Sequence, residues 1–144
     1  MVQKHLDRAM LAFLAVTVAM AICSWPAIAD AQNVTEFPIP SPVSGDQPIA
    51  GVAAGSDGAL WFTEPGANKI GRITTAGTIT EYAIPTSRSV PVGIAAGSDG
   101  ALWFAEGIGN KIRRVTTAGT FTEYVIPTSP GTPIGIAAGP DGAL

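Results

Sequence analysis

The sequence has few of the side chains that most often carry chemistry. It contains one histidine, His5, and one cysteine, Cys23, and both lie near its beginning. The rest of the 144-residue chain therefore has no thiol for a disulfide or a cysteine-based metal site. It also has no imidazole for general base catalysis or metal ligation. These two absences restrict the possible chemistry more than any motif that is present.

Charge is scarce as well. Only 13% of the residues are charged, against about 25% in an average protein, and the net charge is −3. A nucleic-acid-binding domain carries a basic patch, so we expect no nucleic-acid partner. The chain is 47% hydrophobic, with 17 glycines and 12 prolines that recur in register between short apolar runs. This pattern predicts many turns and an all-β fold.

The beginning of the chain has a different composition from the rest. A short head with two basic residues precedes residues 9–25, which carry no charge, and small residues at A-x-A spacing end at Ala29 or Ala31. This is the pattern of a secretory signal peptide. The uncharged stretch of 17 residues is short for a membrane span of about 20. We expect a signal over 1–31 and a secreted or periplasmic domain over 32–144 with no stable membrane span; a retained anchor is the alternative.

A 42-residue repeat fills the predicted domain. The tetrapeptide GSDG begins residues 55–96 and returns at the start of residues 97–138, and GPDG begins a further copy at 139–144. The first two copies are identical at 30 of 42 positions. Repeats of this length are typical of solenoids and propellers. Helical arrays are excluded by the density of Gly, Pro and Thr.

Each copy contains four strand-like segments separated by turn signals. Asp99-Gly100 and Ala118-Gly119 are the turn signals of the second copy, since glycine accepts a positive φ. Around them the expected strands are residues 93–96, 101–106, 111–116 and 120–126. Four short strands in about 42 residues predict a propeller blade. In the first copy Leu60 and Phe62 would face one side and Trp61 the other, as a sheet packed between two neighbours requires.

The repeat count predicts a partial β-propeller of about 2.7 blades. Residues 34–40 match residues 79–85, which form the expected fourth strand, but no first three strands precede them. In a closed ring those strands would come from the far C-terminus, and the two chain ends would share one blade. Propellers have four to eight blades. We therefore expect the chain to be a fragment of a longer propeller.

The blades resemble the virginiamycin B lyase (streptogramin B lyase) family. The segments DGALWFTE, NKIGRIT and ITEYAIPT carry the resemblance, which covers residues 33–144. It implies a complete protein with seven blades, monomeric, with Mg²⁺ near the axis. It also implies antibiotic resistance by elimination: a base removes the proton α to the ester carbonyl of a cyclic depsipeptide, and the carboxylate leaves.

Few site candidates result when the family pattern is carried over by position. The family's catalytic histidine follows the proline of P-x-G-I, and this slot holds Val92 and Ile134, which cannot move a proton. We expect no catalytic residue in these blades, and the substrate-binding residues stay unassigned. A metal-ligating glutamate of the family follows the WF segment, where Glu64 and Glu106 stand. These two are the candidates for Mg²⁺; the alternative is that they end a strand and accept hydrogen bonds from a neighbouring blade.

The other recurring polar and aromatic residues have structural interpretations. Asparagine side chains cap turns, tryptophans fill cores, and arginines pair with carboxylates across strands. The expected roles are turns for Asn68 and Asn110, the core between blades for Trp61 and Trp103, and ion pairs with Glu81 and Glu123, or with the next blade, for Arg72 and Arg114.

Two functions remain open from the sequence. The first is a secreted relative of the streptogramin lyases whose catalytic blades lie outside this stretch. The second is a non-catalytic propeller that binds a small molecule, a cell-wall component or a protein. The close blade motifs favour the first function. The near-identity of the two copies favours the second, because an active site needs residues that differ between blades, and fold alone does not give function.

Overall fold

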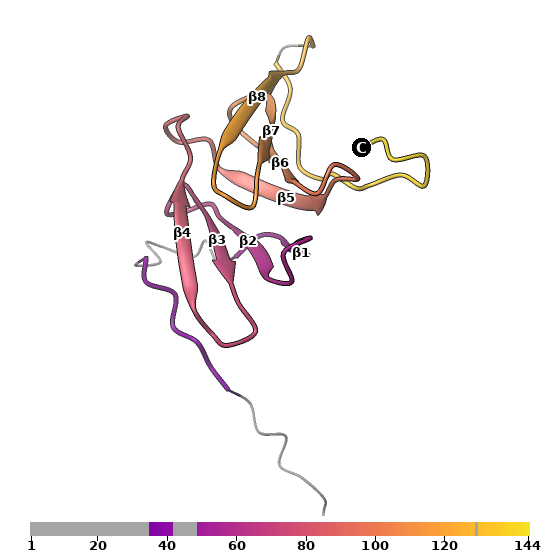
Figure 1. Cartoon of the computed structure of the whole chain (residues 1–144). Helices are drawn as coiled ribbons and strands as arrows, with labels where there is room; N and C mark the ends of the chain where they lie inside the picture. Colours follow the sequence, from indigo (N-terminus) through magenta and orange to yellow (C-terminus); the bar gives the residue numbers. More distant parts are fainter. Residues whose placement is uncertain (1–34, 42–48, 129) are drawn as a thin grey trace, which may run out of the picture. The chain divides into compact units, whose positions relative to one another are not determined.

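The computed structural model describes residues 35–41, 49–128 and 130–144, which form strands and connections without a helix (Figure 1). The expected signal peptide over 1–31 lies outside these residues. No helix in the described part of the chain is long and apolar enough to cross a membrane. The expectation of an all-β fold is confirmed over the described residues.

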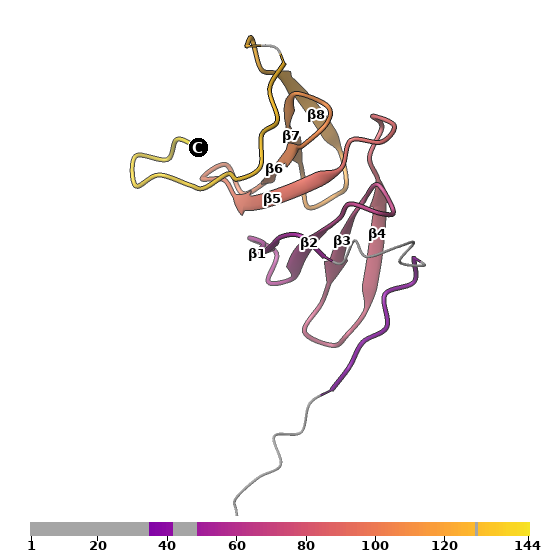
Figure 2. The same ribbon diagram turned by 180° about the vertical axis from the view of Figure 1, so that it is seen from behind.

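Two four-stranded antiparallel sheets make up the fold, each with its strands hydrogen-bonded in chain order (Figures 1 and 2). The first sheet contains β1 (Val52–Ala54), β2 (Leu60–Glu64), β3 (Lys69–Ile73) and β4 (Ile79–Ala83). The second contains β5 (Pro91–Ala96), β6 (Leu102–Glu106), β7 (Lys111–Val115) and β8 (Phe121–Val125). The strands expected from the second copy of the repeat agree with these bounds to within two residues at each end.

The turn between the first two strands of each sheet is an Asp-Gly turn. Gly100 has a φ of 76°, a conformation that only glycine adopts without strain. Asp99 Oδ1 accepts hydrogen bonds from the backbone N–H of Ala101 at 3.2 Å and from Trp103 Nε1 at 3.1 Å. The same bonds occur in the first sheet. The turn therefore also fixes the orientation of the tryptophan that follows it.

The core lies between the two sheets. Trp61 and Ile70 of the first sheet are fully buried with Leu102, Phe104 and Val115 of the second. Alternation along β2 directs Trp61 into this core and its neighbours to the opposite face. The predicted position of Trp61 between blades is confirmed.

Trp103 has a different environment from Trp61. It is partly buried and stacks on Tyr124 of its own sheet, with ring centroids 5.1 Å apart. Its face of the second sheet is turned away from the first sheet, because β6 has the same alternation as β2.

Residues 37–41 lie against the first sheet as the end of the first copy lies against the second sheet. A side chain at Gly77 would collide with the ring of Phe37, and one at Gly119 would collide with the ring of Tyr82. The sequence match of residues 37–40 with residues 82–85 is thus reproduced in packing. Residues 35–39 form no strand, because none of the described strands is hydrogen-bonded to them.

Candidate functional site

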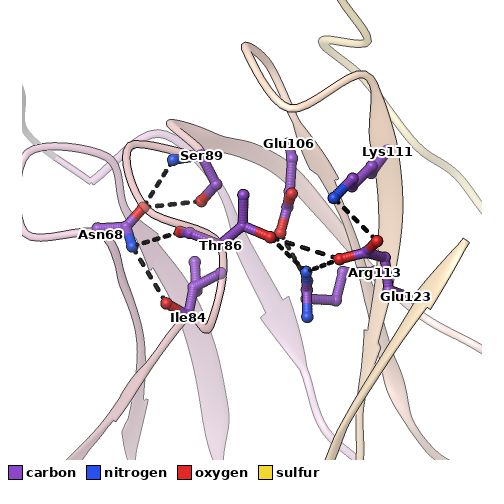
Figure 3. Close-up of polar contacts among 8 residues, drawn as sticks. All are labelled: Asn68, Ile84, Thr86, Ser89, Glu106, Lys111, Arg113 and Glu123. Carbon is purple, nitrogen blue, oxygen red and sulfur yellow. Dashed lines mark hydrogen bonds and ion pairs between the residues drawn. The ribbon is translucent and has the colours of Figure 1, made fainter. Parts of the chain in front are cut away.

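The best-defined polar cluster lies where the second sheet meets the connection that precedes it (Figure 3). Glu106 ends β6, and its Oε1 accepts a hydrogen bond from Arg113 Nε at 2.6 Å. Both side chains are almost completely buried. Arg113 Nη2 also donates to Thr86 Oγ1 at 2.5 Å and to Glu123 Oε2. One guanidinium therefore joins three acceptors, of which Thr86 belongs to the connection from the first sheet.

Two cations balance the two carboxylates of this cluster. Lys111 Nζ lies 2.8 Å from Glu123 Oε1. The hydrogen bond from Lys111 is the main reason that the pKa of Glu123 lies below its ordinary value. Register explains the arrangement: Glu106 is opposite Lys111, and Arg113 is opposite Glu123, so all four side chains emerge from one face of the sheet.

An asparagine positions the connection that carries Thr86. Asn68 has a φ of 55°, and its Oδ1 accepts the backbone N–H and the Oγ–H of Ser89 at 2.8 Å each. Its Nδ2 donates to the carbonyl oxygens of Ile84 and Thr86 at 3.2 and 2.8 Å. The predicted turn role of Asn68 is confirmed.

Asn110 has the same turn role in the second sheet, but with fewer partners. Its φ is 51° and its Nδ2 donates to Ile126 O at 3.0 Å. Its Oδ1 is buried without a hydrogen-bond partner. Gly131 stands where the first copy has Ser89, so the hydroxyl donor is missing.

The first sheet has the same glutamate without the arginine. Glu64 is 7% exposed and its Oε1 is buried without a partner. Gly71 occupies the position that corresponds to Arg113, and the ring of Phe62 lies where a side chain of residue 71 would start. Burial, and next the negative charge of Glu81, raise the pKa of Glu64 to about 7. Near neutral pH this carboxyl is thus partly protonated.

Lys69 is the cation on the face of the first sheet that carries Glu64, but it binds Glu81 and not Glu64. Its Nζ lies 2.6 Å from Glu81 Oε2 and 2.6 Å from Ser41 Oγ. Ser41 Oγ also donates to Glu81 Oε2 at 2.8 Å, in the place that Thr86 takes in the second sheet. Burial opposes ionisation of Glu81, but the bonds from Lys69 and Ser41 outweigh it and hold its pKa below the ordinary value.

The predicted partners of the repeated arginines were wrong. Arg72 pairs with Asp57 and Arg114 with Asp99, each at 2.6 Å, instead of with Glu81 and Glu123. In register Arg72 is opposite Thr80, whereas Glu81 is opposite Gly71. Neighbouring residues of a strand point to opposite faces, so a shift of one residue separates Arg72 from Glu81. The aspartate of the Asp-Gly turn is within reach of the arginine side chain and forms the ion pair with it.

The described residues do not by themselves form a site that fits Mg²⁺, which takes six oxygen ligands. Glu106 gives one oxygen to a cation, Arg113, and each of the two glutamates has only one buried oxygen without a partner. Over these residues, no group of three or more His, Cys, Asp or Glu side chains could hold a metal ion. The assignment of Glu64 and Glu106 to Mg²⁺ stays a prediction. As for the alternative, the donor to Glu106 comes from its own sheet, not from a neighbouring blade.

The P-x-G-I segment at the start of β5 lies at the same end of the second sheet as Glu106. Pro91 is opposite Glu106 in register, and Val92 follows it. The carbonyl oxygen of Val92 accepts the Oγ–H of Thr63 at 2.8 Å, which ties β5 to the first sheet. The equivalent Ile134 is 70% exposed. At this end of the second sheet the P-x-G-I positions therefore carry aliphatic side chains, and the backbone of Val92 serves to join the two sheets.

An apolar groove lies on the face of the first sheet that points away from the second sheet. Its volume is about 250 Å³ and it is lined by Phe37, Ile39, Ile49, Val52, Leu60, Phe62, Ile73 and Ile79. We call it the outer groove. Sequence reasoning did not find it, although the alternation of Leu60 and Phe62 with Trp61 gives the signal for a second apolar face.

Consecutive four-stranded antiparallel sheets that pack face to face and repeat every 42 residues define blades of a β-propeller. The virginiamycin B lyase family model matches residues 26–144, so the chain belongs to this family, as its blade motifs predicted.

Solved structures agree with this assignment. A virginiamycin B lyase from Staphylococcus aureus is 51% identical with a TM-score of 0.69, over 74% of this chain and 35% of that one. A streptogramin B lyase structure is 48% identical with a TM-score of 0.68, over 72% and 34%. A gluconolactonase of Xanthomonas campestris, with 16% identity and a TM-score of 0.57, shares the fold alone.

Curated relatives match over a shorter segment. Virginiamycin B lyase of Bordetella pertussis is 42% identical over 59 residues, which are 41% of this chain and 19% of the relative. The matched part of the chain thus spans about a fifth of that relative and about a third of the solved structures.

Proposed function

We propose that residues 49–128 are supporting blades of a secreted or periplasmic lyase of the virginiamycin B type. In this proposal the complete protein is a monomeric seven-bladed ring that opens the ester of streptogramin B antibiotics by elimination and so confers resistance. The base and most of the Mg²⁺ ligands belong to blades outside these residues. The supporting blades hold the ring together and contribute no catalytic residue.

The observation that carries this proposal is the use of the polar groups at the Glu106 end of the second sheet. Arg113 pairs with Glu106 and Lys111 with Glu123, and Val92 stands in the slot of the catalytic histidine. A catalytically inactive histidine-to-alanine variant of the Staphylococcus aureus lyase has been solved with quinupristin. In the present chain the only histidine is His5.

A second candidate is a propeller without chemistry that binds a small molecule or a cell-wall component. It is favoured by the similarity of the two blades, which are identical at 30 of 42 positions. A binding surface needs no asymmetric catalytic residues. The two candidates differ in whether these blades can support a lyase.

A blade exchange separates the candidates. In the Staphylococcus aureus lyase, two adjacent blades that lack the catalytic histidine are replaced by residues 49–128. We expect quinupristin opening, followed by mass spectrometry, to stay within about tenfold of the parent enzyme, since a tenfold rate change corresponds to only about 1.4 kcal/mol. A graft that replaces the histidine-bearing blade is the control and should be inactive.

Two results would contradict the proposed role of these blades. One is a blade graft that folds, by circular dichroism, yet opens no quinupristin. The other is turnover by purified residues 32–144 alone, which we expect to be inactive.

A further inference from the structure

The Asp-Gly turn of each copy joins two residues that react with each other in unstructured chains. The backbone nitrogen that follows an aspartic acid can attack the side-chain Cγ, and glycine hinders this attack least because it has no Cβ. A C–N bond forms, the C–O bond of the carboxyl group breaks, and the hydroxyl leaves with the amide proton as water. Water then opens the cyclic imide, and opening at the backbone carbonyl gives isoaspartate. The composition is unchanged, and no oxidant or cofactor is consumed.

The nitrogen atoms that would attack in this way are those of Gly58 and Gly100. Both glycines have a positive φ, of 75° and 76°. Each N–H donates to the carbonyl oxygen of the glycine that begins the turn, Gly55 at 3.2 Å and Gly97 at 3.1 Å. The proton that each nitrogen has to lose is therefore held in a hydrogen bond.

Both carboxylate oxygens of Asp57 are engaged as well. Its Oδ1 accepts hydrogen bonds from Trp61 Nε1 at 3.1 Å and from the N–H of Ala59 at 3.3 Å. Its Oδ2 accepts Arg72 Nε at 2.6 Å. Burial opposes ionisation of Asp57, but the bonds from Arg72 and Trp61 outweigh it and hold its pKa below the ordinary value.

Asp99 repeats this arrangement at greater exposure, 39% of the side chain against 19% for Asp57. Its Oδ1 accepts Trp103 Nε1 at 3.1 Å, and its Oδ2 accepts Arg114 Nε at 2.6 Å. The bonds from Arg114 and next from Trp103 lower the pKa of Asp99 to about 2. The imide forms from the protonated carboxyl, whose hydroxyl is the leaving group, so an ionised carboxylate does not react. We call the arginine and the tryptophan that bind each aspartate its clamp.

A third turn has the same backbone shape without a clamp. Gly142 has a φ of 84°, and its N–H donates to the carbonyl oxygen of Gly139 at 3.1 Å. Asp141 Oδ1 accepts the N–H of Ala143 at 3.1 Å. Over the residues that the structure describes, no indole or guanidinium donates to Asp141. The turn thus forms without the clamp, and what the clamp adds is its hold on the carboxylate.

We propose that Asp57 and Asp99 are latent sites of isoaspartate formation, kept unreacted by the arginine and the tryptophan that clamp each carboxylate. The clamp fixes the carboxylate and keeps it ionised. Isoaspartate would add an atom to the backbone of the turn and move the carboxylate away from the indole. The two sites lie at the ends of the sheets opposite Glu64 and Glu106, and they need no lyase activity.

The test follows isoaspartate in the full chain, warmed at neutral pH for several weeks. Proteolytic peptides are separated by chromatography, and isoaspartate is identified by electron-transfer fragmentation. Arg114→Ala should raise its formation at Asp99 about fivefold or more, the rate factor that a partly exposed ion pair can contribute, and leave Asp57 unchanged. Arg72→Ala should do the reverse. Each variant contains its own control, because unfolding would raise both sites together.

Two further comparisons separate the clamp from a general effect of folding. Arg114→Lys keeps a cation near Asp99 and should retain most of the protection. A synthetic peptide of residues 96–104 has the Asp-Gly pair without the arginine, and it should form isoaspartate about tenfold faster than Asp99 in the parent chain. Equal rates in the peptide and the parent would overturn the proposal. So would unchanged isoaspartate at Asp99 in Arg114→Ala, or an equal rise at both turns in either arginine variant.

Discussion

The two sheets have nearly the same sequence, but the glutamate that ends the second strand of each, Glu64 or Glu106, has different neighbours. In the second sheet Glu106 is paired with Arg113 inside a cluster of two carboxylates and two cations. Glu64 of the first sheet is also buried, and each glutamate has one buried oxygen without a partner, but Glu64 has no arginine beside it. Gly71 stands where the second copy has Arg113, so the cation that pairs with Glu106 has no counterpart beside Glu64. A repeated position therefore does not imply a repeated role.

The comparison also explains how each sheet tolerates its buried acid. Removing one partner of a buried ion pair is costly, because the remaining charge loses its solvation without compensation. The first sheet avoids this charge: burial and Glu81 raise the pKa of Glu64 to about 7, so the carboxyl can stay protonated. The ring of Phe62 fills the volume beside Gly71. Without an arginine beside it, Glu64 therefore takes up a proton near neutral pH.

The largest difference between the sheets should come from the tryptophans. Replacing Trp61 by Ala removes a fully buried ring from the core between the sheets and should cost about 4 kcal/mol of unfolding free energy. Trp103→Ala is the matched control, and it should cost less than half as much because Trp103 is only partly buried. Urea unfolding measures both. Equal losses would mean that the two faces are covered alike.

The arginine of the second sheet should have the next largest effect. Arg113→Ala leaves Glu106 buried without its cation and should cost about 3 kcal/mol. Arg72→Ala is the control: its pair with Asp57 is partly exposed, and exposed pairs contribute less than about 1 kcal/mol. Urea unfolding at pH 7 compares them. If both variants lost the same unfolding free energy, the buried pair of Arg113 with Glu106 would stabilise the fold no more than the partly exposed pair does.

The asparagines of the two turns should differ by a smaller amount. Asn68→Ala leaves the backbone N–H and hydroxyl of buried Ser89 without an acceptor, which should cost about 2 kcal/mol. Asn110→Ala loses one donor and should cost about 1 kcal/mol. Asn→Gly at each position keeps the positive φ accessible, so it separates the turn conformation from the bonds. A larger loss at Asn110 than at Asn68 would contradict this assignment.

Much of the fold could be predicted from the sequence, because the repeat states it more than once. The period, the Asp-Gly turns and the apolar alternation around Trp61 each indicate the same four-stranded unit. The strand bounds and the family followed from these features. What the sequence could not reveal is which copy of a repeated face is covered. Val52 and Ile94 have the same pattern around them, and only the arrangement in space distinguishes them.

The polar cluster was harder to predict for a reason of register. Arg72 and Glu81 are close in sequence and opposite in charge, but they emerge from opposite faces of the sheet. Gly71 is one of the positions at which the two copies differ, yet its consequence for Glu64 depends on the cross-strand pairing of β2 with β3. Side-chain partners of this kind require the register to be known.

The contrast between Glu64 and Glu106 is the central claim, and pH-dependent unfolding of Glu64→Gln and Glu106→Gln tests it most directly. The pKa of Glu64 is raised on folding from 4.5 to about 7, so its ionisation is disfavoured in the folded state and stability should fall as pH rises from 5 to 8. The other carboxyls with shifted pKa values titrate below their ordinary values and do not contribute in this window: they are Asp57, Glu81, Asp99 and Glu123.

Glu64→Gln should therefore remove this slope and gain on the order of 2 kcal/mol at pH 8, with little change at pH 5. Glu106→Gln should lower stability at both pH values, because Arg113 loses its carboxylate. Opposite signs at pH 8 are the predicted result. Two variants that change stability in the same direction at pH 8, or a slope that survives Glu64→Gln, would contradict the account.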